Sequence, residues 1–574
     1  MNEKLKAILH RAWNEPRHFF LWLAMLSVCG FMAAVGSKTV IGPTLLFSFI
    51  ALGCILCFLA SVPAFVLAWI PPVRRLFGWL LRRRFVVLAC LATLVALFYT
   101  VENWRGRHAW QTYKAAWEAK GEHFDLASFV PPQVPAEQNF FESPLFRDLS
   151  PANKNNRILD IFGPKSGEAP GTGNWTKPQR VDLTAWQAFY RGSNNVFSAG
   201  DGPQTNYFPV AKEPQSPAED VLLALSRFDG NRRLLIEAAA RPQARFGINY
   251  DAGYAAVLPH LAHMKAIAQY LSLHGCAALK SGDKQTALED SRLLFRLLEA
   301  TRREPTLISF LVRIAVGQIA LQPLWEGLAD RQWTDAELSL FEIELGKLDF
   351  LADYQFAMRG ERAFNLWAVD FIHKAGISGW TEMASSEGQD SKSDEFLGKA
   401  AFRLVPAGWF DQNKLSLCLA HERYSLPAVD MEKRLVSTEL SRPFLATLGK
   451  QRLRPYDVFS RMLLPAVARI AERSARAQTS VDLARVACAL ERYRLANTRY
   501  PETLLELPPK YIPELPHDVI SGKPLGYHRT EDGQFVLYSV GWNGTDDGGK
   551  VELTKAGNPD PDKGDWVWSY TAAR

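Results

Sequence analysis

Three long apolar runs without a charged residue lie within the first hundred residues. They are Phe19–Gly36, Ile41–Ile70 and Phe85–Val101, with lengths of 18, 30 and 17 residues. About 20 apolar residues span the hydrocarbon core of a bilayer as a helix, and about 17 is near the lower limit. The pattern therefore predicts three transmembrane helices, the second of which is long enough to tilt or to extend into the membrane interface.

From about residue 217 the apolar positions recur with the period of an α-helix. Asp283 follows a Gly and is a plausible N-cap, and the stretch Thr334–Glu337 has the form of a capping box. We expect consecutive antiparallel helices joined by short turns, as in an α-hairpin or solenoid. The expected helices cover residues 217–240, 259–281, 285–303, 306–329, 334–348 and 352–372.

The segments around these helices have different patterns. Residues 102–121 continue the third span as a polar helix, which the proline-rich stretch Phe129–Pro135 ends. Residues 136–215 are rich in Asn, Gly, Pro and Ser, which indicates either a long wrapping layer or a partly mobile insertion, with one short helix at Asp182–Arg191. A long helix is expected within Pro455–Asn497, followed by turns and an alternating strand near residue 535.

These patterns together predict a mainly α protein with a small α+β region at its C-terminal end. The expected parts are three transmembrane helices in 1–101, a stalk helix and irregular segment in 102–215, and an α-helical domain in 216–454. A long helix and a small sheet in 455–574 complete the chain.

The charge distribution indicates where each part lies. The formal net charge of the chain is +6, but residues 1–101 carry +8, so residues 102–574 carry −2. The basic residues gather before the first apolar run and between the second and third, and basic loops stay in the cytoplasm. We therefore expect a bacterial inner-membrane protein with a cytoplasmic N-terminus and with residues 102–574 outside. A cleaved signal peptide at the first run is the alternative, and nucleic acid is excluded as an expected partner.

The C-terminal motifs, taken in order, form a recognisable string. A long helix leads to Tyr500-Pro501, a Gly522-Lys-Pro-Leu-Gly-Tyr527 turn and a strand. A Ser539-Val-Gly-Trp-Asn-Gly544 loop and a Gly564-Asp565-Trp566 end follow. This order over about residues 480–570 resembles the C-terminal domain of the type II secretion major pseudopilin, and the whole chain resembles large uncharacterised bacterial membrane proteins with similar ends.

The resemblance implies a calcium site in the C-terminal loop. The expected ligands are Asn543, Asp546, Asp547 and Asp565, and one member of the family's closing acidic pair is missing here. Such oxygen donors, between glycines that permit tight turns, suit Ca²⁺. The alternative is a solvated acidic loop. The residues that could substitute for the missing acid are Glu552, Asp560 and Asp562.

Other candidate sites are weaker. Residues 544–550 match the spacing of a phosphate-binding loop, but Val551 replaces the required Ser or Thr, so no nucleotide is expected. His260 and His263 are one turn apart and could bind zinc together with His274 or Asp251. Cysteines 276, 418 and 488 allow one disulfide of undetermined pairing.

No strong catalytic motif occurs in the sequence. The expected function is therefore a non-enzymatic, membrane-anchored, periplasm-facing binding or scaffold protein of an envelope or secretion assembly, with a possible Ca²⁺-stabilised cap. Its expected partners are the lipid bilayer and envelope or secretion proteins. An exported membrane-anchored hydrolase with a site in the helical domain is the alternative.

Overall fold

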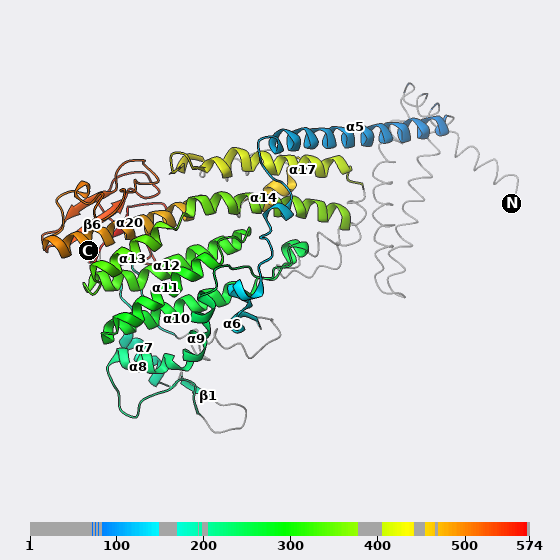
Figure 1. Ribbon diagram of the computed structural model, residues 1–574. Helices are drawn as coiled ribbons and strands as arrows, with labels where there is room; N and C mark the ends of the chain where they lie inside the picture. Colours follow the sequence, from blue (N-terminus) through cyan, green and yellow to red (C-terminus); the bar gives the residue numbers. More distant parts are fainter. Residues whose placement is uncertain are drawn as a thin grey trace. The chain divides into compact units, whose positions relative to one another are not determined.

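The computed structural model describes residues 72, 75, 79, 83–147, 169–192, 195–197, 205–376, 404–440, 454–464 and 469–570 (Figure 1). Within these residues the protein is mainly helical with a few short strands, as the sequence predicts. The predicted spans Phe19–Gly36 and Ile41–Ile70 lie outside the described residues. The chain divides into two compact units, which comprise residues 1–112 with 370–412, and residues 113–369 with 413–574. The predicted four-part division stays a prediction.

The long helix α5 (Arg84–Glu118) contains the third apolar run and continues without a break into the predicted polar helix. Its apolar part is exposed, with Phe85 at 76%, Leu88 at 60% and Leu94 at 62% of their full accessible surface. By length and composition residues 85–118 could cross a membrane, and no residue of the apolar window is buried. The structure thus gives weak support for membrane association. The topology, with a cytoplasmic N-terminus and residues 102–574 outside, stays a prediction.

Within the first unit, α5 meets the start of α17 (Ala407–Ala420) at a close helix crossing. A side-chain carbon placed on Gly106 would lie 2.0 Å from the Gly408 carbonyl oxygen, so only glycine fits at this crossing. The Gly408 amide donates to the Asn103 side chain at 2.9 Å, and the Trp409 indole donates to Glu102 at 3.0 Å. The crossing lies at the point where α5 changes from apolar to polar sequence.

The second unit contains the predicted run of antiparallel helices with one difference (Figure 1). The predicted helix 217–240 is divided in two by a 3₁₀ turn at Ser226–Phe228. Helix α10 packs against α8, α11 and α12, and α11 also packs against α9 and α12. These helices are α8 (Pro217–Leu225), α9 (Asp229–Ala239), α10 (Pro259–Ser281), α11 (Lys284–Ala300), α12 (Leu307–Ala329), α13 (Asp335–Gly346) and α14 (Phe350–Ala375).

The predicted helix boundaries depend on local capping, which the structure confirms. The Asp283 side chain accepts from the Thr286 amide at 3.1 Å at the start of α11. Thr334 and Glu337 form the reciprocal capping box of α13. Gly282 ends α10 with a φ of 90°, a left-handed conformation that glycine adopts without strain.

The helix α20 (Ile470–Asn497) connects the helical layer to the C-terminal sheet (Figure 1). It packs against α12 and α13 and also against the sheet strands β6 and β7, so most of its residues are buried. The sheet has the antiparallel order β5 (Gly526–Arg529), β6 (Phe535–Ser539), β7 (Trp566–Trp568), with Gly526 opposite Tyr538 and Ser539 opposite Trp566. The predicted strand near residue 535 is confirmed.

The remaining elements are short. The short helices are α6 (Pro144–Arg147), α7 (Leu183–Arg191) and α19 (Val458–Leu463). Two-residue strands pair as β1 (Val196–Phe197) with β2 (Thr205–Asn206) and as β3 (Val429–Asp430) with β4 (Leu435–Val436). Single turns of 3₁₀ or π helix lie at Leu126–Phe129, Ala136–Gln138, Phe140–Glu142, Ser226–Phe228, Tyr250–Ala255, His421–Ser425, Leu426–Ala428 and Leu504–Glu506.

The described parts of the irregular segment 136–215 pack onto the helices of the second unit. Asn139 forms a bridge with Gln243, and the Trp175 indole donates to the Gln318 carbonyl at 3.2 Å. The predicted short helix appears as α7, whose N-cap is Asp182. In these parts the segment is a wrapping layer.

The cysteines that could have formed a disulfide do not pair. Cys276, Cys418 and Cys488 are buried and free. Burial raises the pKa of the Cys418 thiol to about 12, which keeps it protonated and unreactive at neutral pH.

Candidate functional site

The four residues predicted to bind calcium lie in the loop region between β6 and β7, where hydrogen bonds connect three of them. Asp565 is 3% exposed and accepts from the backbone amides of Asp547, at 3.2 and 3.3 Å, and Gly549, at 2.7 Å. The Asn543 side-chain amide donates to an Asp547 carboxylate oxygen at 3.1 Å. Asp546 accepts from the Gly548 amide at 3.0 Å. The loop therefore holds its own backbone through these side chains.

The electrostatics of this loop are partly those of a cation site. Burial raises the pKa of Asp565, and the charges of Asp547 and Asp546 raise it further, while the two backbone amides lower it. The oxygen donors therefore fit Ca²⁺ in kind. In the described residues, however, no group of three or more His, Cys, Asp or Glu side chains converges as metal ligands do. The calcium site stays a prediction.

The three carboxylates that could substitute for the missing acid of the calcium site contact other groups. Glu552 pairs with Lys550 at 2.7 Å, and Asp562 pairs with Arg469 at 3.3 Å. The Asp560 backbone amide donates to the Glu552 carbonyl. These contacts keep two of the three carboxylates on basic side chains.

The histidines considered for zinc also have separate partners. His260 contacts Glu304 at 2.8 Å, whereas His263 contacts the Pro259 carbonyl at 2.9 Å. His274 contacts Asp290 at 2.6 Å. His260 and His274 thus make buried contacts to other elements, whereas the His263 contact lies within α10, and the described histidines do not share one ligand sphere.

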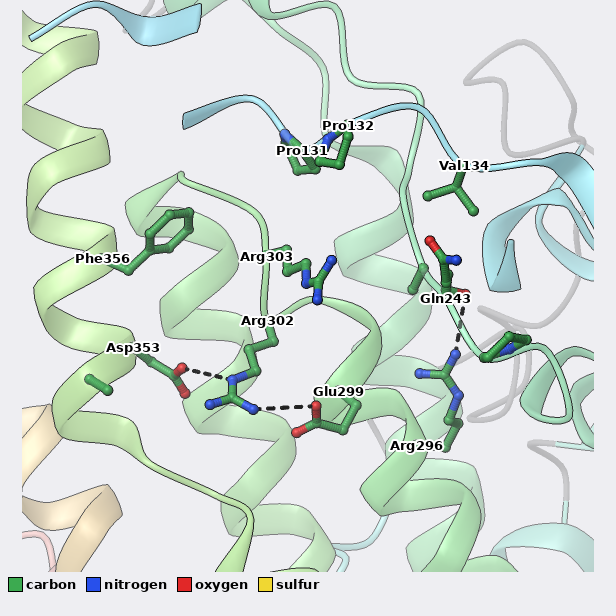
Figure 2. A pocket seen from close by; sticks show the side chains of 13 residues that line it. Pro131, Pro132, Val134, Gln243, Arg296, Glu299, Arg302, Arg303, Asp353 and Phe356 are labelled. Carbon is green, nitrogen blue, oxygen red and sulfur yellow. Dashed lines mark hydrogen bonds and ion pairs between the residues drawn. The ribbon is translucent and has the colours of Figure 1, made fainter. Parts of the chain in front are cut away.

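An arginine-lined cavity of about 710 Å³ lies on the second unit, between α11, α14 and the proline-rich segment before residue 136 (Figure 2). Its walls combine prolines with charged side chains, and its size is typical of ligand sites. The lining residues that matter here are Pro131, Pro132, Arg296, Glu299, Arg302 and Arg303.

Two of the arginines are held by the protein itself. Arg296 donates to the carbonyls of Ala239, Arg241 and Gln243, at 3.4, 2.7 and 3.3 Å, and burial lowers its pKa. It therefore fixes the chain that leaves α9. Arg302 is placed between Glu299 at 3.7 Å and Asp353 at 3.4 Å.

Arg303 differs from both of these arginines. It is exposed, and within the described part of the chain it makes no hydrogen bond or ion pair. In Figure 2 Arg303 lies between the two prolines, Pro131 and Pro132, and the Arg302–Glu299 pair. An unpaired guanidinium on a cavity wall offers a planar group of donors to a carboxylate.

A second cavity of about 610 Å³ extends this one, because the two share Pro242, Arg296, Glu299 and Arg302. It adds Arg292, which is exposed and makes no ion pair within the described residues, and Lys347, which pairs with Glu344 at 2.7 Å. We call the two cavities together the arginine groove. Its basic side chains are Arg292, Arg296, Arg302, Arg303 and Lys347, and its acidic ones are Glu299, Glu344 and Asp353.

The sequence alone does not predict the arginine groove. Its one local signal is the Arg302-Arg303 pair at the end of the expected helix 285–303, which is a common pattern at helix ends. The groove forms only because residues near 131, 242 and 353 fold against the end of α11.

Comparison with known proteins adds no constraint on the site. No family model matches the chain, and no match was found among the curated proteins or the solved structures.

Proposed function

We propose that this protein is a non-enzymatic, membrane-anchored binding or scaffold protein that receives an acidic segment of a partner protein in the arginine groove. The observation that carries the proposal is Arg303, an unpaired guanidinium on the cavity wall. Arg292 repeats this feature at the other end of the groove. The partner expected from the proposal is a protein of an envelope or secretion assembly.

The shape and charge of the groove favour an acidic chain over a small molecule. Two connected cavities of about 710 and 610 Å³ exceed what one small ligand fills. Five basic side chains face three acidic ones, so the groove has an excess of positive charge in a part of the protein that is mildly acidic. Complementary charge of this kind raises association rates and selects partners.

The membrane part of the proposal is supported by α5. Its exposed apolar residues would be covered by lipid, and basic residues directly precede it. We therefore propose anchoring in the bacterial inner membrane, with residues 102–574 outside. A reporter fused after Arg574 should be active outside the cytoplasm, and activity only inside would contradict this topology.

The groove can be tested with the full chain in detergent and a fluorescent octa-glutamate peptide as the probe. We expect Arg303→Glu to weaken binding at least tenfold, because it replaces the unpaired cation with a like charge. Arg499→Glu is the matched control, since Arg499 is exposed and lines neither cavity. An octa-glutamine peptide should not bind.

Three results would contradict the proposal. They are an unchanged affinity in Arg303→Glu, an equal loss in Arg499→Glu, or equal binding of the glutamine peptide. Because Arg303 is exposed, the thermal unfolding temperature should not change, which separates lost binding from lost folding.

We also propose that Ca²⁺ stabilises the C-terminal loop. The support is a buried carboxylate, Asp565, beside the charges of Asp546 and Asp547. A cation that binds only the folded loop would stabilise it in proportion to its concentration. Calcium should then raise the unfolding temperature of the full chain, and Asp546→Asn with Asp547→Asn should remove the rise. An unfolding temperature that neither calcium nor chelator alters would refute it.

A further inference from the structure

A separate cavity of about 400 Å³ lies among α10, α12, α20 and the loop at residues 172–176. It shares no lining residue with the arginine groove. Two buried polar side chains, Ser272 from α10 and Gln322 from α12, face two arginines of α20, Arg473 and Arg476, around it. We call it the α20 cavity.

The two buried polar side chains have atoms without a partner. Ser272 is 1% exposed and Gln322 is 3% exposed, yet the Ser272 hydroxyl and the Gln322 carbonyl oxygen form no hydrogen bond within the described residues. Buried polar atoms are nearly always satisfied, so an unpaired pair lining one cavity indicates a missing partner there. A ligand with hydroxyl groups would satisfy both.

The orientation of Gln322 is fixed by its other end. Its amide nitrogen donates to the Gln179 carbonyl at 3.1 Å and to Glu326 at 2.8 Å. Both donor positions are used, so the side-chain oxygen remains as an acceptor. A hydroxyl donor is the matching group on a ligand.

The charged wall of the cavity comes from α20. Arg473 and Arg476 are three residues apart and therefore lie on the same side of the helix. Neither guanidinium makes a hydrogen bond or an ion pair within 4 Å in the described part of the chain. Arg473 is exposed and Arg476 is partly buried, so the cavity runs from the protein surface to the interior. Burial lowers the pKa of Arg476, while the charge of Glu472 raises it.

The loop at the mouth of the cavity is built to approach closely. Gly173 has a φ of +80°, and a side-chain carbon there would lie 2.5 Å from the Gln322 amide nitrogen. Trp175 fixes the loop through its hydrogen bond to the Gln318 carbonyl and through a ring contact with Trp568 at 5.1 Å. The loop is thus held by both the helical layer and the C-terminal sheet.

We propose that the α20 cavity binds a small hydroxylated anion, whose carboxylate or phosphate group contacts Arg473 and Arg476 and whose hydroxyl groups contact Ser272 and Gln322. The volume suits a ligand of sugar-acid size. This site is independent of the proposed peptide groove, since the two have no residue in common.

Calorimetric titration of the full chain in detergent tests the proposal with four probes. They are glucuronate, glucose 6-phosphate, neutral glucose and inorganic phosphate. We expect at least one sugar anion to bind at least tenfold more tightly than glucose, and also more tightly than inorganic phosphate. The difference from glucose measures the contribution of the arginines to binding. The difference from inorganic phosphate measures the contribution of the hydroxyl contacts. Comparing the two sugar anions shows whether the anionic group is a carboxylate or a phosphate.

Two variants localise the binding. Arg476→Gln should reduce the affinity at least tenfold. Ser272→Ala should reduce the affinity several-fold, because it removes the hydroxyl that contacts the ligand and leaves the fold unchanged. Arg499→Gln is the control, because this arginine lies outside the cavity. The proposal is overturned if neither sugar anion binds at millimolar concentration, if phosphate binds as tightly as the sugar anions, or if Arg476→Gln binds like the unaltered chain.

Discussion

Helices α5 and α12 are both long and apolar enough to cross a membrane, but their surroundings are opposite. The apolar window of α5 has none of its residues buried, whereas 61% of the window in α12 is buried inside the protein. Helix α12 packs against α10, α11 and α20. Similar composition thus occurs in one helix whose apolar window is exposed and in another that forms the core of the second unit.

The polar residues of the two helices explain the difference. Arg313 on α12 is 1% exposed and binds Asp353 at 2.8 Å, and Gln322 binds Gln179 and Glu326. These contacts supply internal partners for polar groups that a bilayer would leave unpaired. The apolar part of α5 from Phe85 to Val101 contains no charged residue.

The largest effect should come from breaking the buried ion pair of α12. Arg313→Met leaves Asp353 with only its weaker contact to Arg302, and we expect a loss of about 4 kcal/mol in the free energy of unfolding. Urea unfolding of the full chain in detergent measures it. The double variant with Asp353→Leu should recover much of the loss, and a double variant as unstable as the single one would show that the ion pair is not the cause.

A matched pair of leucines tests the comparison directly. Leu324→Ala on α12, where the leucine is 0% exposed, should destabilise the second unit by about 3.5 kcal/mol through the cavity it leaves. Leu94→Ala on α5, where the leucine is 62% exposed, should change the free energy of unfolding by less than about 0.5 kcal/mol. Equal effects in the same unfolding assay would remove the distinction between the two helices.

Glu361 of α14, beside the first turn of α12, should also make stability depend on pH. Burial raises the pKa of Glu361 to about 7, although the Tyr254 hydroxyl and the Leu307 amide of α12 lower it. The folded state therefore favours the protonated acid. The stability that protonated Glu361 contributes to the folded state is fully present below its ordinary pKa of about 4.5. This contribution, about 3 kcal/mol of unfolding free energy, is lost as the pH rises through about 7.

This contribution has a sign opposite to that of a paired surface acid. Glu361→Gln should flatten the unfolding free energy between pH 4.5 and pH 7 relative to the unaltered chain. A slope that stays the same in Glu361→Gln would assign the pH dependence to other groups.

The smallest effect should come from the N-cap of α12. The Thr306 hydroxyl accepts from the Ser309 amide at 3.0 Å, so Thr306→Ala should cost about 1 kcal/mol. Thr306→Ser keeps the acceptor and should recover most of it. Thermal unfolding that does not separate these two variants would show that the cap contributes little.

The sequence predicts the helices well because their signals are local. Asp283 and Thr334 mark helix starts within three residues of the atoms they bind, and the apolar period of residues 259–281 appears unchanged in α10. The predicted calcium residues also lie in one loop, as their spacing suggests.

The arginine groove and the α20 cavity could not be predicted in the same way. The arginine groove joins Pro131, Arg303 and Asp353, and the α20 cavity joins Gly173, Ser272 and Arg476. Within each cavity these residues are roughly 50 to 300 positions apart in the sequence, and no local pattern shows that Arg303 lacks a partner. Only the packing of α11, α14 and α20 brings them together.

The position of α20 has a consequence for how the chain reaches its final state. The helices of residues 217–369 follow one another along the chain and are synthesised first. Helix α20, which packs against α12 and α13, begins only at Ile470. The apolar surfaces of α12 and α13 that α20 covers therefore stay exposed until nearly the whole chain has been synthesised. Truncation anywhere before Ile470 removes a central helix from the core, so incomplete chains of this protein should be targets for chaperones and proteases.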